Sequence, residues 1–191
     1  MLRAAALAVV LATVPALAAE REARAPATLP AQASTQLSRS LEGAARHPSH
    51  VWRDTPPLND DGTVNGYVEI SRGDGRKWDY NMGANRRAID RTTPAEVGGY
   101  PVNYGFVPQT VSYDGDPFDA LVLGPPIDGG QTVRGIVIGL MYMEDEKGLD
   151  SKVVLSSPRP DGRPLHELTT REQQRIAEYF RRYKEHQPGA F

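Results

Sequence analysis

The stretch from Tyr100 to Leu123 reads YPVNYGFVPQTVSYDGDPFDALVL and gives the strongest structural signal in the chain. It ends in an apolar run of the kind that forms a buried strand. Just before that run, the carboxylates of Asp114, Asp116 and Asp119 lie within six residues of one another. Two unit charges about 4 Å apart repel by roughly 4 kcal/mol at the effective dielectric near a protein surface. The fold must therefore place a cation beside these groups or raise the pKa of one of them.

Hard divalent ions such as Mg²⁺ prefer carboxylate and water ligands, so the acidic stretch predicts a metal site. An EF-hand calcium loop is the nearest alternative. Counted from Asp114, its sixth and twelfth positions would be Asp119 and Pro125, where that loop requires Gly and Glu. The sequence therefore predicts a different kind of site, for two or more ions.

Short β-type runs alternate with turn signals from Asp61 onward. The predicted strands cover residues 67–70, 77–80, 87–90, 118–123, 133–143 and 152–155. The run 133–143 is rich in Val and Ile, and it is predicted to be buried on both faces.

One helix is predicted near the end of the chain. Thr169 and Glu172 have the spacing of a capping box, and Ile176, Phe180 and Tyr183 then follow on one helical stripe. Many short strands followed by a terminal helix indicate a mainly β, α+β fold, in which a small β-barrel packs against the helix.

A second acidic motif follows the predicted strand 133–143. Asp145 and Asp150 lie on either side of a turn at Gly148, and Lys152 comes directly after them. Carboxylates that follow the end of a buried strand can point into a shared cleft. We therefore expect the barrel to bring Asp145 and Asp150 opposite Asp114, Asp116 and Asp119. Glu69 on the first predicted strand is a further candidate ligand.

Cations and phenols are interleaved with these acids. They are Lys77, Arg91, Tyr100, Tyr104, Lys152, Tyr183 and Lys184. A cleft of carboxylates alone would bind only cations, whereas cations and hydroxyls beside the acids suit an anion that also chelates metal. Phosphate fits that description, because Arg grips phosphate oxygens in a fork and Lys attracts them as a point charge.

Composition narrows the classes of function. The chain has 191 residues, which leaves room for one domain. Its formal net charge is −2, which argues against a nucleic-acid binder because such proteins need a positive groove. Cys is absent, and this excludes thiolate catalysis, Cys-zinc sites and disulfides.

The first 18 residues have the order of an export signal: a basic start at Arg3, an apolar run from Ala4 to Val14, and a small-x-small cleavage site at residues 16–18. An apolar N-terminal helix of the domain is the alternative.

Residues 19–57 are rich in Ala, Pro, Ser, Gln and Arg, and this composition predicts a disordered linker. A short helix near residues 35–45 is the alternative for part of this stretch. The sequence thus predicts a periplasmic or secreted protein with a folded domain over residues 58–191 and no membrane anchor after signal cleavage.

Three motifs, in this order, resemble those of the soluble family I inorganic pyrophosphatases. They are the run that begins at Tyr100, the run Asp114–Asp119 and the run Asp145–Lys152, and the similarity extends from about residue 64 to residue 184. The resemblance implies an OB-like five-stranded barrel with flanking helices, and hydrolysis of pyrophosphate to two orthophosphates with two or more Mg²⁺ ions. It suggests an exported, C-terminally short variant, and assembly into a homo-oligomer is left open.

The resemblance also implies a role for each matching residue. The metal ligands would be Asp114, Asp119, Asp150, Asp145 and Glu69. Asp116 resembles the general base that takes the proton from the attacking water, and Arg91 would offset charge on the leaving phosphate. Phosphate oxygens would be held by Lys77, Arg91, Tyr104, Tyr183 and Lys184, with Tyr100 and Lys152 as nearby support. The chain departs from the family at Asp79, where Glu is common.

Two other functions stay open at this point. Export suggests a broader phosphoanhydride hydrolase that acts on polyphosphate or nucleoside triphosphates. A non-catalytic module that binds metal or phosphate is the second alternative.

Overall fold

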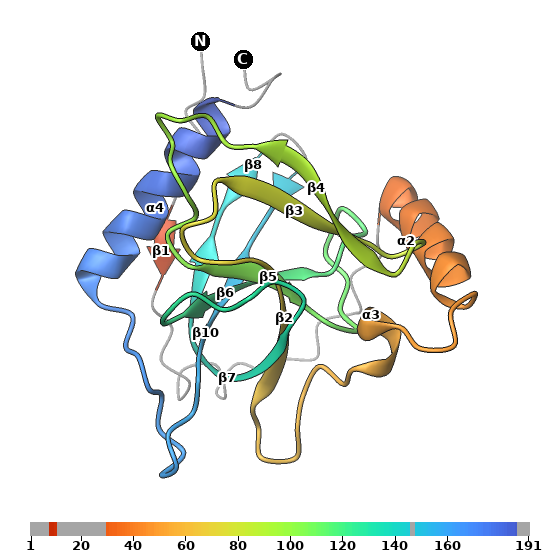
Figure 1. Cartoon of the computed structure of the whole chain (residues 1–191), viewed down its shortest axis with the longest axis horizontal. Helices are drawn as coiled ribbons and strands as arrows, with labels where there is room; N and C mark the ends of the chain where they lie inside the picture. Colours follow the sequence, from red (N-terminus) through yellow and green to blue (C-terminus); the bar gives the residue numbers. More distant parts are fainter. Residues whose placement is uncertain (1–7, 11–29, 146–147, 187–191) are drawn as a thin grey trace.

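Five strands of the computed structural model close into a barrel (Figure 1). In order around the barrel they are β2 (Val64–Ile70), β5 (Asn103–Val107), β6 (Phe118–Leu123), β10 (Lys152–Ser156) and β7 (Thr132–Tyr142), and β7 pairs with β2 to close the ring. All neighbours are antiparallel except β6 and β10, which run parallel. The structure describes residues 8–10, 30–145 and 148–186. The predicted mainly β barrel is confirmed.

Strand β5 is the barrel strand that the sequence did not predict. It pairs with β2 and β6, and Gly105 lies opposite Val68 on one side and Ala120 on the other. A Cβ atom at Gly105 would meet the carbonyl oxygen of Tyr67 at 1.8 Å. Glycine is needed for this close approach, and it interrupts the alternating pattern by which a strand is recognised.

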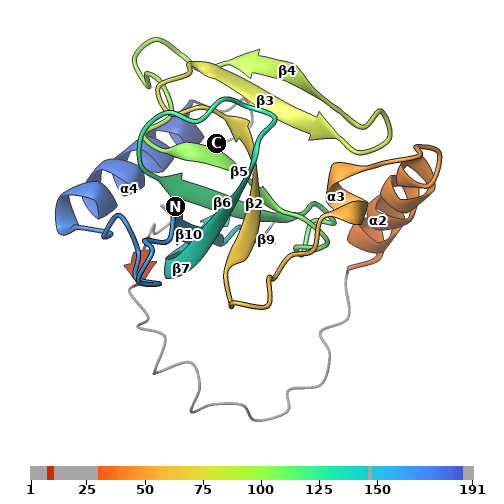
Figure 2. The ribbon, with the colours of Figure 1, turned by 60° about the horizontal axis from the view of Figure 1, so that its bottom comes forward.

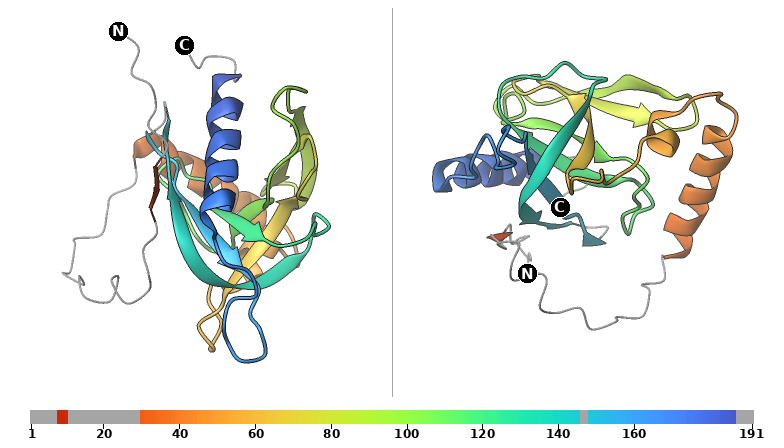
Figure 3. Two further views of the ribbon diagram at one scale, coloured as in Figure 1. Left: turned by 90° about the vertical axis from the view of Figure 1, so that its left-hand side faces the viewer. Right: turned by 90° about the horizontal axis from the view of Figure 1, so that it is seen from below.

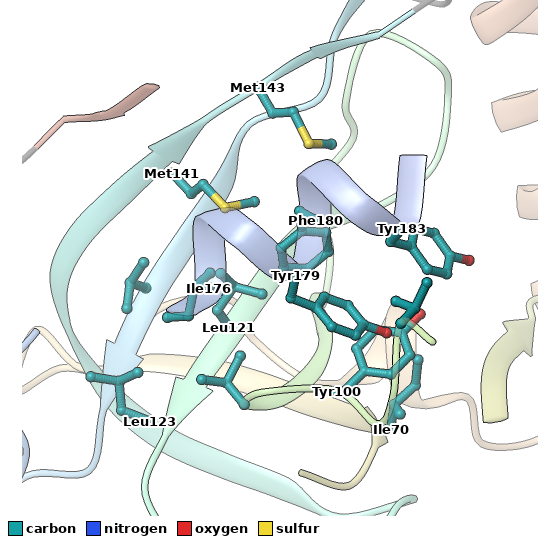
Figure 4. Packing of buried hydrophobic residues seen from close by; sticks show 13 residues of the cluster. Ile70, Tyr100, Leu121, Leu123, Met141, Met143, Ile176, Tyr179, Phe180 and Tyr183 are labelled. Carbon is teal, nitrogen blue, oxygen red and sulfur yellow. The ribbon is translucent and has the colours of Figure 1, made fainter. Parts of the chain in front are cut away.

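The largest core cluster joins the barrel to helix α4 (Thr170–Glu185), as Figure 4 shows. The predicted capping box begins this helix: the side chain of Thr169 accepts from the N–H of Glu172, and the Glu172 carboxylate accepts from the N–H of Thr169. The buried residues of the helix are Ile176, Tyr179, Phe180 and Tyr183. They pack in one cluster with Leu121 and Met141 of the barrel. Each such side chain contributes about 1.5–3 kcal/mol when fully buried, so the cluster fixes α4 firmly on the barrel.

Strand β6 sends alternate side chains to two sides. Leu121 and Leu123 belong to the cluster with α4, whereas Ala120 and Val122 belong to a second cluster. Successive residues of a strand point to opposite faces, so Asp119 shares the side of Leu121. The pleat of β6 therefore directs this carboxylate toward the side that α4 covers.

Two short hairpins accompany the barrel. Strands β3 (Arg76–Asn81) and β4 (Arg86–Thr92) form a separate two-stranded sheet to one side of the barrel (Figures 2 and 3). Both strands include the predicted ranges, 77–80 and 87–90, and are longer than predicted. Strands β8 (Glu144–Asp145) and β9 (Gly148–Leu149) form the second hairpin.

Helices occupy part of the stretch that was expected to be a disordered linker, and one of them includes most of the short helix that was left open near residues 35–45. Helix α2 (Ala31–Ala44) and the short helix α3 (Val51–Asp54) lie on the opposite side of the barrel from α4 (Figures 1 to 3). Ala33 and Ala44 of α2 are buried, as is Trp52 of α3. The helix α2 packs through small residues, which leave no strong apolar stripe in the sequence, and this explains the difference.

Strand β7 differs from the expectation in its burial. It was predicted to be buried on both faces, but most of its residues are half-buried or exposed. The strand is 11 residues long, and its two ends extend past the core, with Thr132 and Tyr142 exposed. The apolar run therefore reflects strand formation more than two-sided burial.

A three-residue strand, β1 (Ala8–Val10), pairs with the edge of β7 outside the closed barrel. The remainder of the predicted signal segment lies outside the described residues. Among the helices of the described ranges, none is long and apolar enough to cross a membrane.

Candidate active site

A cleft of about 530 Å³ brings the predicted site residues together. Its walls come from β2, the β3–β4 hairpin, β5, the loop before β6, the start of β10 and the end of α4. The predicted residues that line it are Glu69, Lys77, Arg91, Tyr100, Tyr104, Asp114, Asp116, Asp119, Asp150, Lys152, Tyr183 and Lys184. Asp145 belongs to β8, and its side chain lies outside the described part of the structure.

The centre of the cleft is a buried ammonium between two carboxylates. Nζ of Lys152 donates to Oδ2 of Asp119 at 2.5 Å and to Oδ1 of Asp150 at 2.6 Å, and its side chain is only 2% exposed. The hydroxyl of Tyr104 donates to the same Asp119 oxygen at 2.5 Å. Nζ of Lys184 lies 3.7 Å from the other oxygen of Asp150. Residues 119 and 150, far apart in the chain, therefore face one common point.

Burial and charge together set the protonation of this centre. Burial acts to lower the pKa of Lys152, but the charges of Asp119 and Asp150 outweigh it, so the pKa is raised and the ammonium stays charged. Burial raises the pKa of Asp150, and Lys152 opposes that shift. Burial, reinforced by the Asp119 charge, raises the pKa of Tyr104 well above its usual range. Tyr104 is therefore a neutral phenol that can donate a hydrogen bond.

Glu69 is the most deeply placed acid of the cleft. Burial raises its pKa to about 8, and the N–H of Tyr80, which donates to Oε1 at 2.6 Å, opposes the shift. The charges of Asp119 and Asp79 add to the increase. Glu69 thus ties β2 to the β3–β4 hairpin and holds a proton until a cation approaches.

Glu69→Gln is expected to flatten the pH dependence of stability in the metal-free protein. The pKa of Glu69 is about 8 in the folded state against an ordinary value of 4.5. The folded state therefore binds this proton more tightly, and the free energy of unfolding falls as pH rises from about 5 to about 8. Glutamine stays neutral and can still accept from the N–H of Tyr80. Urea unfolding in EDTA at both pH values should show that the free energy of unfolding falls less for the variant than for the wild type.

The exposed Glu167 provides the control for this comparison. Glu167→Gln should lose as much stability between the two pH values as the wild type does. Equal losses in Glu69→Gln and in the wild type would contradict the assignment of the high pKa to Glu69.

The β3–β4 hairpin supplies the positive side of the cleft. Lys77 and Arg91 are direct partners in the register of the two strands. Nζ of Lys77 lies 3.1 Å from Asp79 and 3.5 Å from Asp90, and Nε of Arg91 donates to Asp90 at 2.8 Å. Two cations thus lie side by side and are paired with neighbouring acids, and one of these acids, Asp79, also lines the cleft.

The loop before β6 presents the first acidic group. The N–H of Asp116 donates to Oδ1 of Asp114 at 3.1 Å, and the N–H of Ser112 donates to the carbonyl of Asp116 at 2.7 Å. Gly115 between the acids has φ +91°, a conformation that favours glycine. The side chain of Gln36 in α2 donates to Oδ1 of Asp116 at 2.5 Å.

Tyr100, Tyr104 and Tyr183 line the side of the cleft where β5 meets α4. Tyr100 is only 3% exposed and packs its ring on Tyr104, Tyr179 and Tyr183, with centroids 5.5, 5.1 and 6.2 Å away. Tyr100 is therefore mainly a packing residue of the cleft wall. The hydroxyl oxygens of Tyr179 and Tyr183 are both buried without a hydrogen-bond partner of good geometry among the described residues, next to Tyr100 (Figure 4).

The donor set fits divalent cations by its chemistry. Oxygens of Asp119 and Asp150 already converge on one ammonium, and Asp114 and Asp116 line the same cleft. Across the described ranges, no three acidic or imidazole side chains stand close enough together to hold an ion as they are. Lys152 occupies the central position and supplies the balancing charge.

Two polar contacts with the predicted site residues came from side chains that were not predicted. Asp90 pairs with both Lys77 and Arg91, and Gln36 contacts Asp116. Asp90 directly precedes Arg91 in the sequence, and this position could have indicated that the two side chains pair. Nothing local marks Gln36, because the contact joins residues 80 positions apart.

Comparisons with known proteins identify the family of the chain. Residues 66–190 match the family model described as inorganic pyrophosphatase. The inorganic pyrophosphatase of Aquifex pyrophilus is 34% identical over 146 residues, which cover 72% of this chain and 82% of that protein. The inorganic pyrophosphatase of Sulfolobus acidocaldarius is 33% identical over 145 residues, covering 72% of this chain and 83% of its own.

Solved structures give the same result. The inorganic pyrophosphatase of Thermus thermophilus superposes with a TM-score of 0.64 at 32% identity, covering 72% of this chain and 81% of that one. The structure from Neisseria gonorrhoeae gives a TM-score of 0.63 at 31% identity, with 71% and 82% covered. By sequence, by fold and by the content of its cleft, the chain belongs to the family I inorganic pyrophosphatases.

Proposed function

We propose that the protein hydrolyses inorganic pyrophosphate to two orthophosphates in a Mg²⁺-dependent reaction. The observation that carries the proposal is the combination of acids and cations in one cleft. Asp119 and Asp150 flank Lys152, while Lys77 and Arg91 lie side by side on the hairpin that borders the same space. Such a site suits a substrate that carries several negative charges and also chelates metal.

The acids would hold the ions. Asp114, Asp119 and Asp150 are the ligands for ions resident in the cleft, and Asp145 and Glu69 are those for ions that arrive with substrate. When bound, Mg²⁺ lowers the pKa of a coordinated water and offsets the charge of the phosphates. The raised pKa of Glu69 fits this role, since a nearby cation favours its ionised form.

Asp116 would accept the proton of the attacking water. Its side chain is exposed at the mouth of the cleft, on a loop whose backbone is fixed by the hydrogen bond from Ser112. The reaction needs no covalent nucleophile, because phosphoryl transfer depends mainly on positioning and electrostatic stabilisation.

The cations and phenols would hold phosphate oxygens and offset charge on the leaving group. These residues are Lys77, Arg91, Tyr104, Tyr183 and Lys184. Lys152 is 2% exposed, and this burial favours a role in holding Asp119 and Asp150 over direct contact with substrate.

Phosphate release from pyrophosphate by the purified protein tests the proposal. We expect rapid release with Mg²⁺ and none in EDTA, and we expect pyrophosphate to be turned over faster than tripolyphosphate or ATP. A clear preference for the triphosphates would favour the broader phosphoanhydride hydrolase. Folded protein that binds Mg²⁺ but releases no phosphate from any of the three would refute the proposal and support a binding module.

The proposal includes export, on the strength of the order of basic, apolar and small residues in the first 18 positions. Mass spectrometry of protein from fractionated cells tests it. An N-terminus at Ala19 in the periplasm or medium would support export, and an intact Met1 in the cytoplasm would contradict it.

Removal of residues 1–18 is expected to leave turnover unchanged. The deletion takes away β1, which pairs with the outer edge of β7, but it removes no strand of the closed barrel and no residue of the cleft. Steady-state kinetics on the shortened and full-length proteins measure this. A large loss of turnover in a protein that melts at the same temperature would show that the segment takes part in the enzyme.

A further inference from the structure

Helix α2 lies before residues 66–190, the stretch that matches the family, yet it reaches the acidic loop of the cleft. The side-chain amide of Gln36 donates to Oδ1 of Asp116 at 2.5 Å. Asp116 is the residue to which the proposed function gives the proton of the attacking water. An element outside the family core therefore contacts the proposed general base.

Backbone contacts hold α2 in place at both ends. Near its start, Ala33 is 1% exposed, and a Cβ atom at Gly115 would come within 2.7 Å of the Ala33 carbonyl oxygen. Near its end, a Cβ atom at Gly43 would lie 2.6 Å from the Cα atom of Gly83, in the turn between β3 and β4. Between them, Leu37 packs against the cluster that contains Trp52.

These contacts give α2 a defined place relative to both sides of the cleft. The acidic loop lies at one end of the helix, and the hairpin with the phosphate-binding cations lies at the other. Two chain segments approach this closely only where glycine removes the side chain, so the sites at Gly115 and Gly43 tolerate little movement.

The hydrogen bond from Gln36 reaches this side chain from an element outside its own loop. The backbone of Asp116 is held by Ser112, and the amide of Gln36 fixes the direction of one carboxylate oxygen of Asp116. Holding a reacting group in one geometry before the reaction removes an entropic cost from the barrier. We propose that α2 is a positioning element of the enzyme and that Gln36 is the positioning residue that orients the carboxylate of Asp116. This inference rests on the proposed function.

Gln36→Ala is compared with Gln32→Ala. Gln32 lies one turn earlier on the same face of α2, is also exposed, and makes no contact with the acidic loop among the described hydrogen bonds. A hydrogen bond to a charged group is strong enough that its loss should lower kcat for pyrophosphate about tenfold in Gln36→Ala. We expect KM and the melting temperature to stay at their wild-type values, and we expect Gln32→Ala to behave as the wild type.

Two further substitutions separate orientation from packing. Gln36→Glu keeps the size of the side chain but faces Asp116 with a like charge, so its kcat should fall below that of Gln36→Ala. Gln32→Glu adds the same charge one turn away and should change little. Gln36→Asn keeps the amide on a shorter chain and should recover part of the lost kcat.

Hydrogen–deuterium exchange of the metal-free proteins gives a readout that does not depend on activity. Amides of residues 112–116 should exchange faster in Gln36→Ala than in Gln32→Ala. Equal exchange and equal kcat in the two variants would overturn the inference, and so would a gain in kcat in Gln36→Ala. If the wild type itself released no phosphate, the proposed function would fail, and the catalytic role of Gln36 would fail with it.

Discussion

Asp119→Asn is expected to lower the turnover of pyrophosphate about a thousandfold. One oxygen of Asp119 accepts from both Lys152 and Tyr104, each at 2.5 Å, so this carboxylate lies at the meeting point of the charged groups. Asparagine has nearly the same shape but no charge, so it attracts a divalent ion and the ammonium of Lys152 much more weakly. A bound metal supplies several kcal/mol of charge stabilisation to the transition state, and each 1.36 kcal/mol corresponds to a factor of ten in rate, which gives about three powers of ten.

Asp128→Asn is the matched control for this substitution. Asp128 is exposed on the loop between β6 and β7 and does not line the cleft, so the same chemical change there should leave turnover at the wild-type level. Thermal unfolding shows whether both variants are folded. Turnover of Asp119→Asn within tenfold of the wild type at saturating Mg²⁺ would show that Asp119 is not a metal ligand.

Lys152→Met is expected to destabilise the metal-free protein by about 3 kcal/mol, because removing one partner leaves the other charges uncompensated in a buried position. The carboxylates of Asp119 and Asp150 are each about a quarter exposed and share this one buried ammonium. Methionine keeps roughly the length of the Lys152 side chain but removes the ammonium, whose Nζ lies 5.6 Å from the ring centroid of Tyr104 and 5.7 Å from that of Phe180. Mg²⁺ should restore more stability to the variant than it adds to the wild type, since the ions replace the missing positive charge.

Urea unfolding in EDTA and in Mg²⁺ measures both effects. Lys184→Met is the control, because Lys184 is more exposed, lies 3.7 Å from Asp150, and should cost less than about 1 kcal/mol when removed. If Lys152→Met were as stable as the wild type in EDTA, or gained no more from Mg²⁺, then Lys152 would not be the charge that holds the two acids together.

The parts of the fold that could be predicted from sequence are those with a strong local pattern. Strand β6 has the predicted bounds, because the apolar run Ala120–Leu123 follows Asp119 in a stretch bounded by Pro117 and Gly124. Helix α4 begins at its predicted capping box and buries its predicted stripe, since both signals lie within a few residues of each other. The candidate residues of the cleft came from three motifs in a known order and from single residues outside them, such as Glu69 and Lys77. The barrel brings all of them except Asp145 to one described cleft.

The parts that could not be predicted depend on contacts between distant segments. Strand β5 carries Gly105 because the backbone of β2 lies against it, and that reason is invisible until the two strands are paired. Helix α2 packs through Ala33 and Gly43, which produce no apolar periodicity. The contact of Gln36 with Asp116 depends on that packing, so it too is absent from any local pattern.

Anomalous diffraction from crystals soaked in Mn²⁺ tests most directly whether distant acids meet around metal ions. Mn²⁺ favours the same oxygen ligands as Mg²⁺ and can be located by its own scattering. We predict anomalous peaks within about 2.5 Å of carboxylate oxygens of Asp114, Asp119 and Asp150. Crystals that show well-ordered side chains at these three positions and no peak between them would contradict the metal centre on which the proposed reaction depends.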